Sequence, residues 1–434
     1  MFRRKWSGLP ADPEFPTSLK ELGYFVNDDD EIRSIENPDT YFHFFLSRNQ
    51  RWNDRQRYCM NQSLQDIIWE RLENLGMKKV PLPLGTTDLT KLHVPIFISK
   101  DIAAKSRVVV IFGESAQALG VLAQRVVGGA GGVSKGSMVS IVSKLQKQRS
   151  SPSDSSPPGI ILANMGELLW WPAGNRALSV HAFNGTPRKS AVHFGHEVTD
   201  KNKIPHNADM KEHVHYIFDE VIPHFVKDSA KIDVVGVGDS AETVEQYLDL
   251  PPIWPQWKDR ISSLSLVGGM HPVWELKNDE FVNVFLRNKA RAYITSDEPA
   301  GMAISGPEGN PKSKSFTQIG CPVFSSGEPY YIECVLIAGA DVILDWIQEV
   351  AMTPENEDYA NPEFHIVFDD PPPDDWHDWT DCKGEESDLK DEAQAGKDGN
   401  EDASAEAPKQ RLVVLNRPSG DHTEDHDEDK DAWA

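Results

Sequence analysis

The stretch Ile232-Asp-Val-Val-Gly-Val-Gly-Asp-Ser-Ala-Glu242 decides the fold class. Its first half is almost wholly apolar, which is typical of a strand that is buried on both faces of a parallel sheet. The two glycines and the Asp-Ser pair that follow predict a tight turn. A helix is expected directly afterwards, over residues 241–248. The stretch therefore predicts a buried strand that turns sharply into a helix.

Apolar runs and helical segments alternate on both sides of this stretch. Further strands are predicted at 106–113, 159–165, 261–267, 290–295 and 322–324, with an edge strand at 94–99 because Pro95 cannot donate to a ladder. Helices are predicted at 52–75, 119–127, 137–147, 210–226, 279–288 and 341–350. Such an alternation requires right-handed crossovers and a mostly parallel sheet covered on both faces. The predicted fold class is therefore α/β.

Charge divides the chain into two parts. Residues 353–434 contain 26 acidic and 7 basic side chains, whereas the whole chain has a net charge of −24. Residues 1–352 therefore carry only about −5, which is ordinary for a globular domain. We expect residues 1–50 to be an N-terminal extension of a domain formed by residues 51–352. Residues 353–434 are expected to be an acidic, largely disordered tail.

The cysteines and the hydropathy of the chain indicate its environment. The four cysteines are widely spaced and form no C-x-x-C pair. This spacing argues against a zinc module and against a disulfide framework, and it suits a reducing compartment. No apolar run reaches the length of a signal peptide or of a membrane-spanning helix. A soluble intracellular protein is therefore expected.

The turn at Ser240 suggests a catalytic motif. A serine on a sharp strand-to-helix turn is typical of the nucleophile elbow of α/β hydrolases, G-x-S-x-G. Gly238 stands at the first glycine position, but Glu242 stands at the second. The backbone amide of Ala241 would then supply half of an oxyanion hole. The alternative is a serine that only caps the helix.

The other parts of a hydrolase site are incomplete. Asp297 or Glu298 could be the acid, because both follow the strand at 290–295. The triad of an α/β hydrolase follows the chain order serine, acid, histidine, but residues 299–352 contain no histidine. His271 could be recruited as the base, although it precedes the candidate acids in the chain.

The predicted oxyanion loop is also degraded. The loop after the strand at 106–113 would supply the second half of the oxyanion hole from Gly113 and Glu114. Carboxylates at Glu114 and Glu242 near one pocket would oppose an oxyanion. We therefore predict an inactive hydrolase site.

Other kinds of site are not expected. His206, His213, His215 and His224 lie near one another in the sequence, but His213 and His215 would face different sides of a helix. No metal site is predicted from them. The glycine-rich segment 128–132 lacks the order of a phosphate-binding loop, so no nucleotide cofactor is expected. The acidic charge and the scattered basic residues argue against direct nucleic-acid binding.

A set of motifs in chain order extends over about residues 15–350. They are Phe15-Pro-Thr-Ser-Leu with Gly23-Tyr24, Arg51-Trp-Asn with Arg57-Tyr58, Lys78-Lys-Val-Pro-Leu-Pro, Val108-Val-Val-Ile-Phe-Gly113, the turn at Ser240, His271-Pro-Val-Trp274, Ser296-Asp-Glu-Pro299 and Cys321-Pro322. Together they resemble the argonaute-binding protein 2 domain family. This domain also occurs in an animal cotranscriptional regulator and at the C-terminus of fungal class II histone deacetylases.

The resemblance implies an α/β-hydrolase-like fold that is used mainly for protein contacts. In fungi it implies membership of an argonaute-containing complex that acts in small-RNA handling and heterochromatin assembly, and hence a location in the nucleus, the cytoplasm or both. Some relatives keep a histidine near the late Cys-Pro. Here Tyr330 and Tyr331 stand in its place.

Three functions follow as hypotheses. The first is a non-catalytic adaptor whose partners are an argonaute-type protein and companion subunits, with chromatin or histone deacetylase components as further candidates. The alternative is a serine esterase with Ser240 as nucleophile, Asp297 or Glu298 as acid and His271 as base. A third is a cleft that binds a small ligand without turnover. A histidine within about 3.2 Å of Ser240 would separate the esterase from the adaptor.

Overall fold

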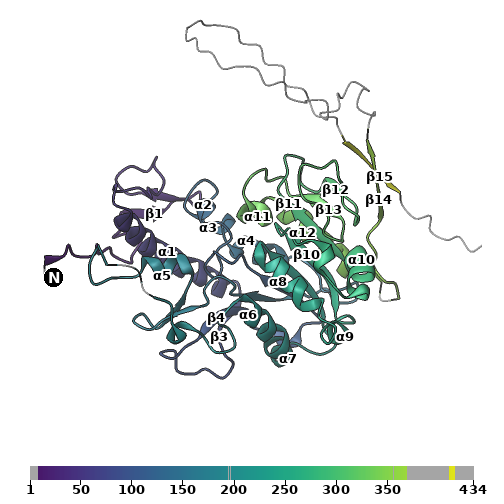
Figure 1. Cartoon of the computed structure of the whole chain (residues 1–434), viewed down its shortest axis with the longest axis horizontal. Helices are drawn as coiled ribbons and strands as arrows, with labels where there is room; N and C mark the ends of the chain where they lie inside the picture. The colour runs from purple at the N-terminus through teal and green to yellow at the C-terminus, as the bar shows by residue number, and fades with distance from the viewer. Residues whose placement is uncertain (1–7, 194, 196, 355, 369–409, 416–434) are drawn as a thin grey trace, which may run out of the picture. The chain divides into compact units, whose positions relative to one another are not determined.

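The computed structural model describes residues 8–193, 195, 197–354, 356–368 and 410–415. The chain forms two compact units, Met1–Asn361 and Pro362–Ala434. The first unit contains the sheet, the helices and every candidate site residue, and Figure 1 shows helices on both faces of its sheet.

The first unit is built on a nine-stranded sheet in the part of the chain that the structure describes. Its strand order is β12-β13-β11-β10-β9-β5-β6-β4-β3. The six strands from β13 to β6 run parallel, and β12, β4 and β3 pair in antiparallel fashion. The strands are β3 (Met77–Leu82), β4 (Val94–Ser99), β5 (Arg107–Phe112), β6 (Gly159–Ala163), β9 (Lys231–Val237), β10 (Ile261–Val267), β11 (Ala290–Ile294), β12 (Ala303–Ser305) and β13 (Val323–Ser325).

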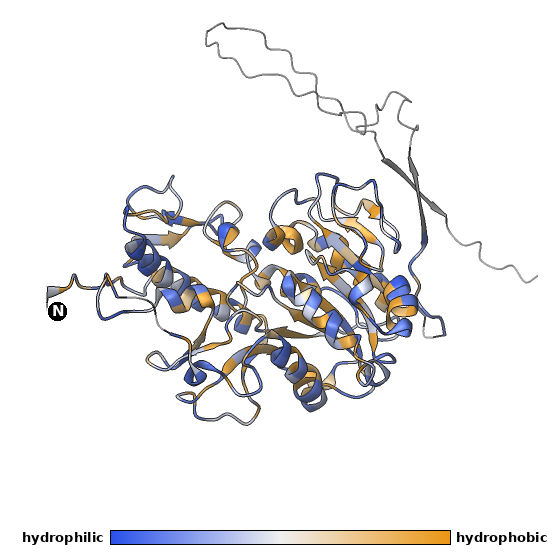
Figure 2. Cartoon of the chain, viewed as in Figure 1, coloured by the Kyte–Doolittle hydropathy of each residue, from blue (hydrophilic) through white to orange (hydrophobic). Residues whose placement is uncertain are grey.

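The sheet confirms the predicted fold class. Each predicted strand is present, and the central ones are buried along almost their whole length, as the apolar runs required (Figure 2). The prediction of an edge strand at 94–99 is wrong, because β4 lies between β3 and β6. Pro95 is tolerated there since it faces Pro81 of β3, while β6 pairs with β4 only at Phe97 and Ile98.

Helices cover both faces of the sheet. One group contains α6 and α8, which pack together, and another contains α1, α4 and α12. The helices are α1 (Gln50–Asn74), α2 (Gln124–Val127), α3 (Gly132–Lys135), α4 (Met138–Leu145), α5 (Val180–Gly185), α6 (Met210–Tyr216), α7 (Ile222–Phe225), α8 (Asp239–Leu248), α9 (Trp254–Trp257), α10 (Arg287–Lys289), α11 (Val335–Ala338) and α12 (Ala340–Ala351). Two small antiparallel sheets complete the unit, β1 (Tyr24–Val26) with β2 (Ile32–Ser34) and β7 (Leu169–Trp171) with β8 (Arg176–Leu178).

Three predicted helices differ from the structure. Residues 119–127 do not form one helix, since Gly120 has φ +88° and only α2 is helical. The loop before α2 is pressed against α1, where Trp69 Nε1 donates to the Leu119 carbonyl oxygen at 2.9 Å. The helices predicted at 279–288 and 210–226 are present but contain π-helical segments, Phe281–Leu286 and Ile217–Val221.

A buried ion pair lies within the sheet. Arg107 Nε of β5 donates to Asp233 Oδ2 of β9 at 2.5 Å, and Ser263 Oγ of β10 donates to Asp233 Oδ1 at 2.6 Å. The same guanidinium donates to the Arg149 and Ile347 carbonyl oxygens. Because every charged group has partners, this pair is tolerated in an apolar interior. It ties three central strands to α12.

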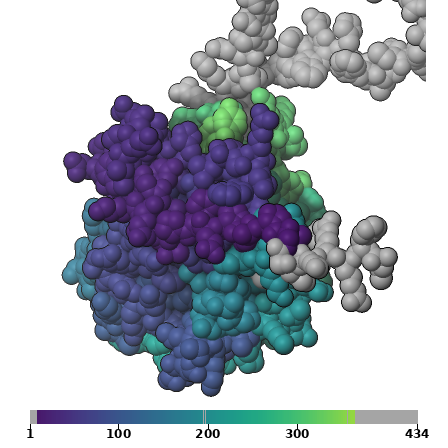
Figure 3. All heavy atoms as spheres, turned by 90° about the vertical axis from the view of Figure 1, so that its left-hand side faces the viewer, coloured from purple at the N-terminus to yellow at the C-terminus, as the bar shows by residue number. Residues whose placement is uncertain are grey.

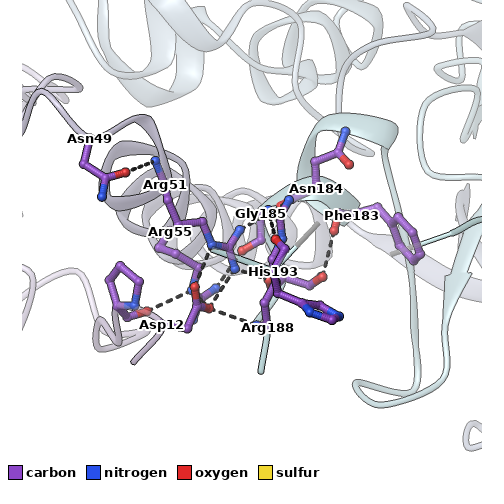
Figure 4. Close-up of polar contacts among 11 residues, drawn as sticks. Asp12, Asn49, Arg51, Arg55, Phe183, Asn184, Gly185, Arg188 and His193 are labelled. Atoms are coloured by element: carbon purple, nitrogen blue, oxygen red, sulfur yellow. Dashed lines mark hydrogen bonds and ion pairs between the residues drawn. The ribbon is translucent and has the colours of Figure 1, made fainter. Parts of the chain in front are cut away.

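The N-terminal segment is fastened to α1 and α5. Figure 3 shows this segment running across the surface of the first unit, and Figure 4 shows the polar cluster beneath it. Arg51 Nε and Nη2 donate to the two oxygens of Asp12 at 2.7 Å, and the Arg188 amide donates to Asp12 Oδ2 at 2.9 Å. Arg51 also donates to the Asn184 and Thr186 carbonyl oxygens, and Arg55 donates to that of Gly185. One buried carboxylate thus joins the segment to both helices.

The end of the first unit lies beyond α12. Tyr359 OH accepts a hydrogen bond from Trp346 Nε1 at 2.9 Å, and Asn361 Nδ2 donates to the Ala290 carbonyl oxygen at 2.8 Å. Residues up to Asn361 therefore belong to the first unit.

The second unit contains one described hairpin. β14 (Glu363–Phe368) pairs in antiparallel fashion with β15 (Gln410–Leu415), which contains the apolar run at 412–415. The tail predicted to be disordered falls mostly on 369–409 and 416–434, which lie outside the described residues. Among the described residues, no helix has the length and apolarity needed to cross a membrane.

Removal of Asp12 should destabilise the first unit. The Asp12 side chain is 8% exposed and that of Arg51 6%, so Asp12→Ala would leave buried guanidinium groups without their carboxylate. We expect the free energy of unfolding in urea to fall by about 3 kcal/mol. The matched control Asp228→Ala removes an exposed carboxylate and should change it by no more than about 0.5 kcal/mol. Equal effects of the two substitutions would contradict this role of Asp12.

Candidate functional site

The tip of the turn between β9 and α8 is Gly238. Its backbone has φ +59° and ψ −132°, a conformation that residues other than glycine rarely adopt because it is strained for them. A Cβ at Gly236 would lie 2.6 Å from Ala241 Cα, so β9 and α8 can approach each other only if residue 236 is glycine. These are the features of a nucleophile elbow, in which the residue at the tip carries the reactive atom. The elbow is therefore Gly236-Val-Gly-Asp-Ser240, with a glycine at the nucleophile position.

Ser240 does not lie at the tip, which differs from the prediction. It is in the first turn of α8 with no solvent exposure, and its Oγ donates to the Gly113 carbonyl oxygen at 2.5 Å. Ser240 fills the position where the hydrolase motif has its second glycine. The Ala241 amide donates to the Gly238 carbonyl oxygen at 3.1 Å within the turn. The predicted use of this amide in an oxyanion hole therefore also differs from the structure.

A cleft of about 540 Å³ opens above the elbow, at the carboxyl ends of β5, β9 and β10. Its floor is formed by glycines, and Glu114 covers the tip, since a Cβ at Gly238 would lie 3.0 Å from Glu114 Cγ. Besides Glu114, the carboxylates of Asp239, Glu242 and Glu333 line it. We call this hollow, with its four carboxylates, the acidic cleft.

The carboxylates of the acidic cleft affect one another. Burial raises the pKa of Glu114, and the negative charges of Asp239 and Glu333 raise it further, against the hydrogen bond from the Ala116 amide. Ser115 Oγ donates to Asp239 Oδ2 at 2.9 Å. An oxyanion that developed at the elbow would be repelled by the carboxylates of the acidic cleft.

The other predicted catalytic residues lie apart. His271 is 3% exposed, and its Nδ1 lies 3.8 Å from Glu242 Oε1. Asp297 and Glu298 are exposed, and within the described residues no hydrogen bond joins either of them to His271. The hydrogen bond of Ser240 goes to a carbonyl oxygen and not to a histidine. The structure thus does not bring the predicted triad together.

The structure contains a second hollow, of about 510 Å³, that was not predicted from the sequence. It lies between α1, the loop at 116–124, β8 and α5, and we call it the polar groove. A polar stripe at helical spacing along α1 was the available signal: Gln50, Asp54, Arg57, Asn61 and Gln65 all line the groove.

A network of polar side chains underlies the polar groove. Glu167 is 3% exposed and accepts hydrogen bonds from Gln65 Nε2 at 2.9 Å and from the Leu119 amide at 2.9 Å. Arg176 Nη2 donates to Gln65 Oε1 at 2.6 Å. Burial raises the pKa of Glu167.

The histidines at 206–224 do not gather around one point. His213 is fully buried; its Nδ1 pairs with Asn207 Oδ1 at 2.6 Å, and its Nε2 accepts from the Asn164 amide at 3.2 Å. His215 instead lies 3.5 Å from Asp219 on the exposed side of α6. The described residues contain no group of three or more side chains that could hold a metal ion.

The strand order, the elbow and the cleft at the carboxyl ends of the strands define an α/β-hydrolase-like protein with a glycine at the nucleophile position. Residues 15–300 match the protein-family model described as the Arb2 domain. The chain belongs to this family. No curated protein matches the chain significantly by sequence.

Solved structures with some likeness to the chain include a histone deacetylase and two hydrolases. The histone deacetylase from Saccharomyces cerevisiae is 12% identical with a TM-score of 0.36, over 67% of this chain and 97% of the other. The esterase Pf2001 of Pyrococcus furiosus is 9% identical with a TM-score of 0.30, over 64% and 93%. A peroxisomal alpha-beta-hydrolase of Saccharomyces cerevisiae is 8% identical with a TM-score of 0.33, over 66% and 92%.

A side chain at the elbow tip should be costly. We expect Gly238→Ala to lower the free energy of unfolding by about 1–3 kcal/mol, because the backbone conformation is strained for alanine. Gly128→Ala is the control, since Gly128 has φ −93° and its added Cβ would make only an ordinary contact of 3.5 Å. Urea unfolding measures the free energy of unfolding of both variants. A Gly238→Ala variant as stable as the control variant would contradict the assigned backbone strain.

The buried His213 should make stability depend on pH. Burial lowers its pKa to about 3, whereas an unfolded histidine has a pKa of about 6.5. Between these values the unfolded chain binds a proton that the folded chain does not, so stability is lost as pH falls. We expect His213→Gln to reduce the slope of unfolding free energy between pH 6 and 4 by about 1.4 kcal/mol per pH unit. Parallel pH profiles for wild type and variant would rule out this contribution.

Proposed function

We propose that the protein is a non-catalytic adaptor built on a hydrolase-like domain. The observation that carries this proposal is Gly238 at the tip of the elbow, where a hydrolase has its nucleophilic side chain. The only hydroxyl within the elbow motif belongs to Ser240, which is buried and hydrogen-bonded to a backbone carbonyl. A side chain in that state is not accessible to an ester.

The electrostatics of the acidic cleft support the same proposal. Acyl transfer needs donors that are aimed at a developing oxyanion. The Ala241 amide already donates to the Gly238 carbonyl oxygen within the turn, and Glu114 lies over the tip. The half-buried Glu114 and its acidic neighbours would raise the energy of an oxyanion.

We propose further that the partners are an argonaute-type protein and companion subunits of a small-RNA silencing complex that acts in heterochromatin assembly. Membership of the Arb2 domain family supports this context. Chromatin or histone deacetylase components are additional candidate partners. The proposed location is the nucleus, the cytoplasm or both.

The proposal predicts that the Ser240 hydroxyl is not needed for chemistry. The protein should not react with a fluorophosphonate serine probe, and Ser240→Ala should recover the same partners as wild type when the full chain is purified from its own cells. The partners are identified by mass spectrometry, with expression level and melting temperature as controls for folding.

Two results would contradict the adaptor. One is labelling of wild type by the probe that disappears in Ser240→Ala. The other is loss of function in a Ser240→Ala variant that remains folded and keeps its partners.

A further inference from the structure

The polar groove contains side chains that could bind a ligand. Within the described residues, six lining side chains make no hydrogen bond through their polar atoms: Arg57, Asn61, Gln117, Gln124, His181 and Asn184. Four of these are carboxamides, each of which can both donate and accept. Peptide backbones present the matching pattern of N–H and C=O groups. The groove therefore has the chemistry to bind an extended main chain.

The floor beneath these side chains is held in place. Glu167 and Gln65 are buried and hydrogen-bonded to each other, to Arg176 and to the Leu119 amide. The wall at α5 is fixed to α1 by Arg51 and Arg55, which donate to three successive carbonyl oxygens at the C-terminal end of α5, those of residues 184–186. A ligand would meet a preformed site, which lowers the entropic cost of binding.

The polar groove and the acidic cleft share a wall. Ala116 and Gln117 line both hollows, so a chain that leaves the groove over this loop enters the cleft. The loop is anchored at its base, where the Gln117 amide donates to the Glu114 carbonyl oxygen and the Leu119 amide to Glu167.

The charges of the two hollows favour a cation. Six carboxyl side chains line them, against the guanidinium groups of Arg57 and Arg176. Arg125 offsets only Glu333, to which its Nε donates at 2.8 Å. Met270 and Ile332 line the acidic cleft and are 59% and 40% exposed, so an aliphatic stem could pack on them. A long aliphatic side chain with a terminal cation fits this combination.

We propose that the polar groove binds an extended peptide of a partner protein, and that a lysine or arginine of this peptide enters the acidic cleft. This proposal rests on the adaptor function and names the surface that would serve it. The carboxamides bind the peptide main chain, and the carboxylates of Glu114, Glu242 and their neighbours select the cationic side chain.

The test uses the full chain and two labelled heptapeptide libraries of Gly, Ala, Ser and Thr. One library has a fixed central lysine and the other a fixed central glutamate. Fluorescence anisotropy should show at least about tenfold tighter binding of the lysine library, and this difference should shrink as salt is added.

Variants locate the binding. Glu114→Gln combined with Glu242→Gln should remove most of the preference for lysine, and Asn61→Ala combined with Gln124→Ala should weaken binding of the lysine library. The control Glu280→Gln changes a carboxylate that is 51% exposed, pairs with Lys258 and lines neither hollow. It should bind like wild type. Melting temperatures identify any variant that fails to fold.

Several results would overturn the proposal. Equal binding of the two libraries would do so, as would unchanged binding in both double variants. The cleft would bind a small cation only if the diamine putrescine displaces the lysine library and the Asn61 and Gln124 substitutions leave binding of that library unchanged. Competition by a peptide of residues 370–384 at the groove would mean that the chain's own acidic segment is the occupant.

Co-purification separates this proposal from the adaptor function. If the glutamate double variant loses the lysine peptide but recovers all partners from cells, the groove is not the adaptor surface and this inference fails alone. If wild type recovers no specific partner while the peptide still binds, the adaptor function fails and the peptide site stands.

Discussion

The close approach of β9 to α8 is the constraint on which the rest of the site depends. A Cβ at Gly236 would lie 2.6 Å from Ala241 Cα, and a Cβ at Gly269 would lie 2.8 Å from Ala241 Cβ. The strand β9 and the loop that follows β10 thus both lie close against the first turn of α8. This crowding forces the chain through the strained backbone of Gly238 and fixes which residue stands at the tip. It also turns Ser240 inward, onto the Gly113 carbonyl oxygen at the end of β5.

The sequence predicted the architecture well because the central strands are buried on both faces. An apolar run such as 106–113 is typical of a strand in the interior of a parallel sheet, and the helices between the strands have a regular period. The elbow was predicted at the right place but two residues out of register. Glycine at a nucleophile position breaks the pattern G-x-S-x-G, so the pattern predicts the nearest serine, Ser240, at the tip. The glycine at 236 was the signal for the correct register.

Long-range polar contacts could not be predicted in this way. Asp12 meets Arg51 across 39 residues of chain, and Arg107 meets Asp233 across 126. Neither carboxylate has a local partner or a periodic position, and Asp233 is hidden inside an apolar run. The motif residues Phe15 and Trp52 likewise meet edge-on, with ring centroids 5.8 Å apart, where the N-terminal segment packs on α1. Two of the motifs that resemble the family, those that contain Phe15 and Trp52, therefore hold the N-terminal segment against the rest of the first unit.

The glycine at the tip of the elbow and the negative charge above it are physically connected. A working elbow excludes carboxylates from its surroundings, because they would raise the energy of the oxyanion. Once glycine occupies the tip, that restriction no longer applies, and Glu114 can lie directly over it. Burial is the main cause of the raised pKa of Glu114, and repulsion by the negative charges of Asp239 and Glu333 adds to it. A cation in the cleft would relieve this repulsion, so a glycine tip with carboxylates above it would favour the binding of a basic partner.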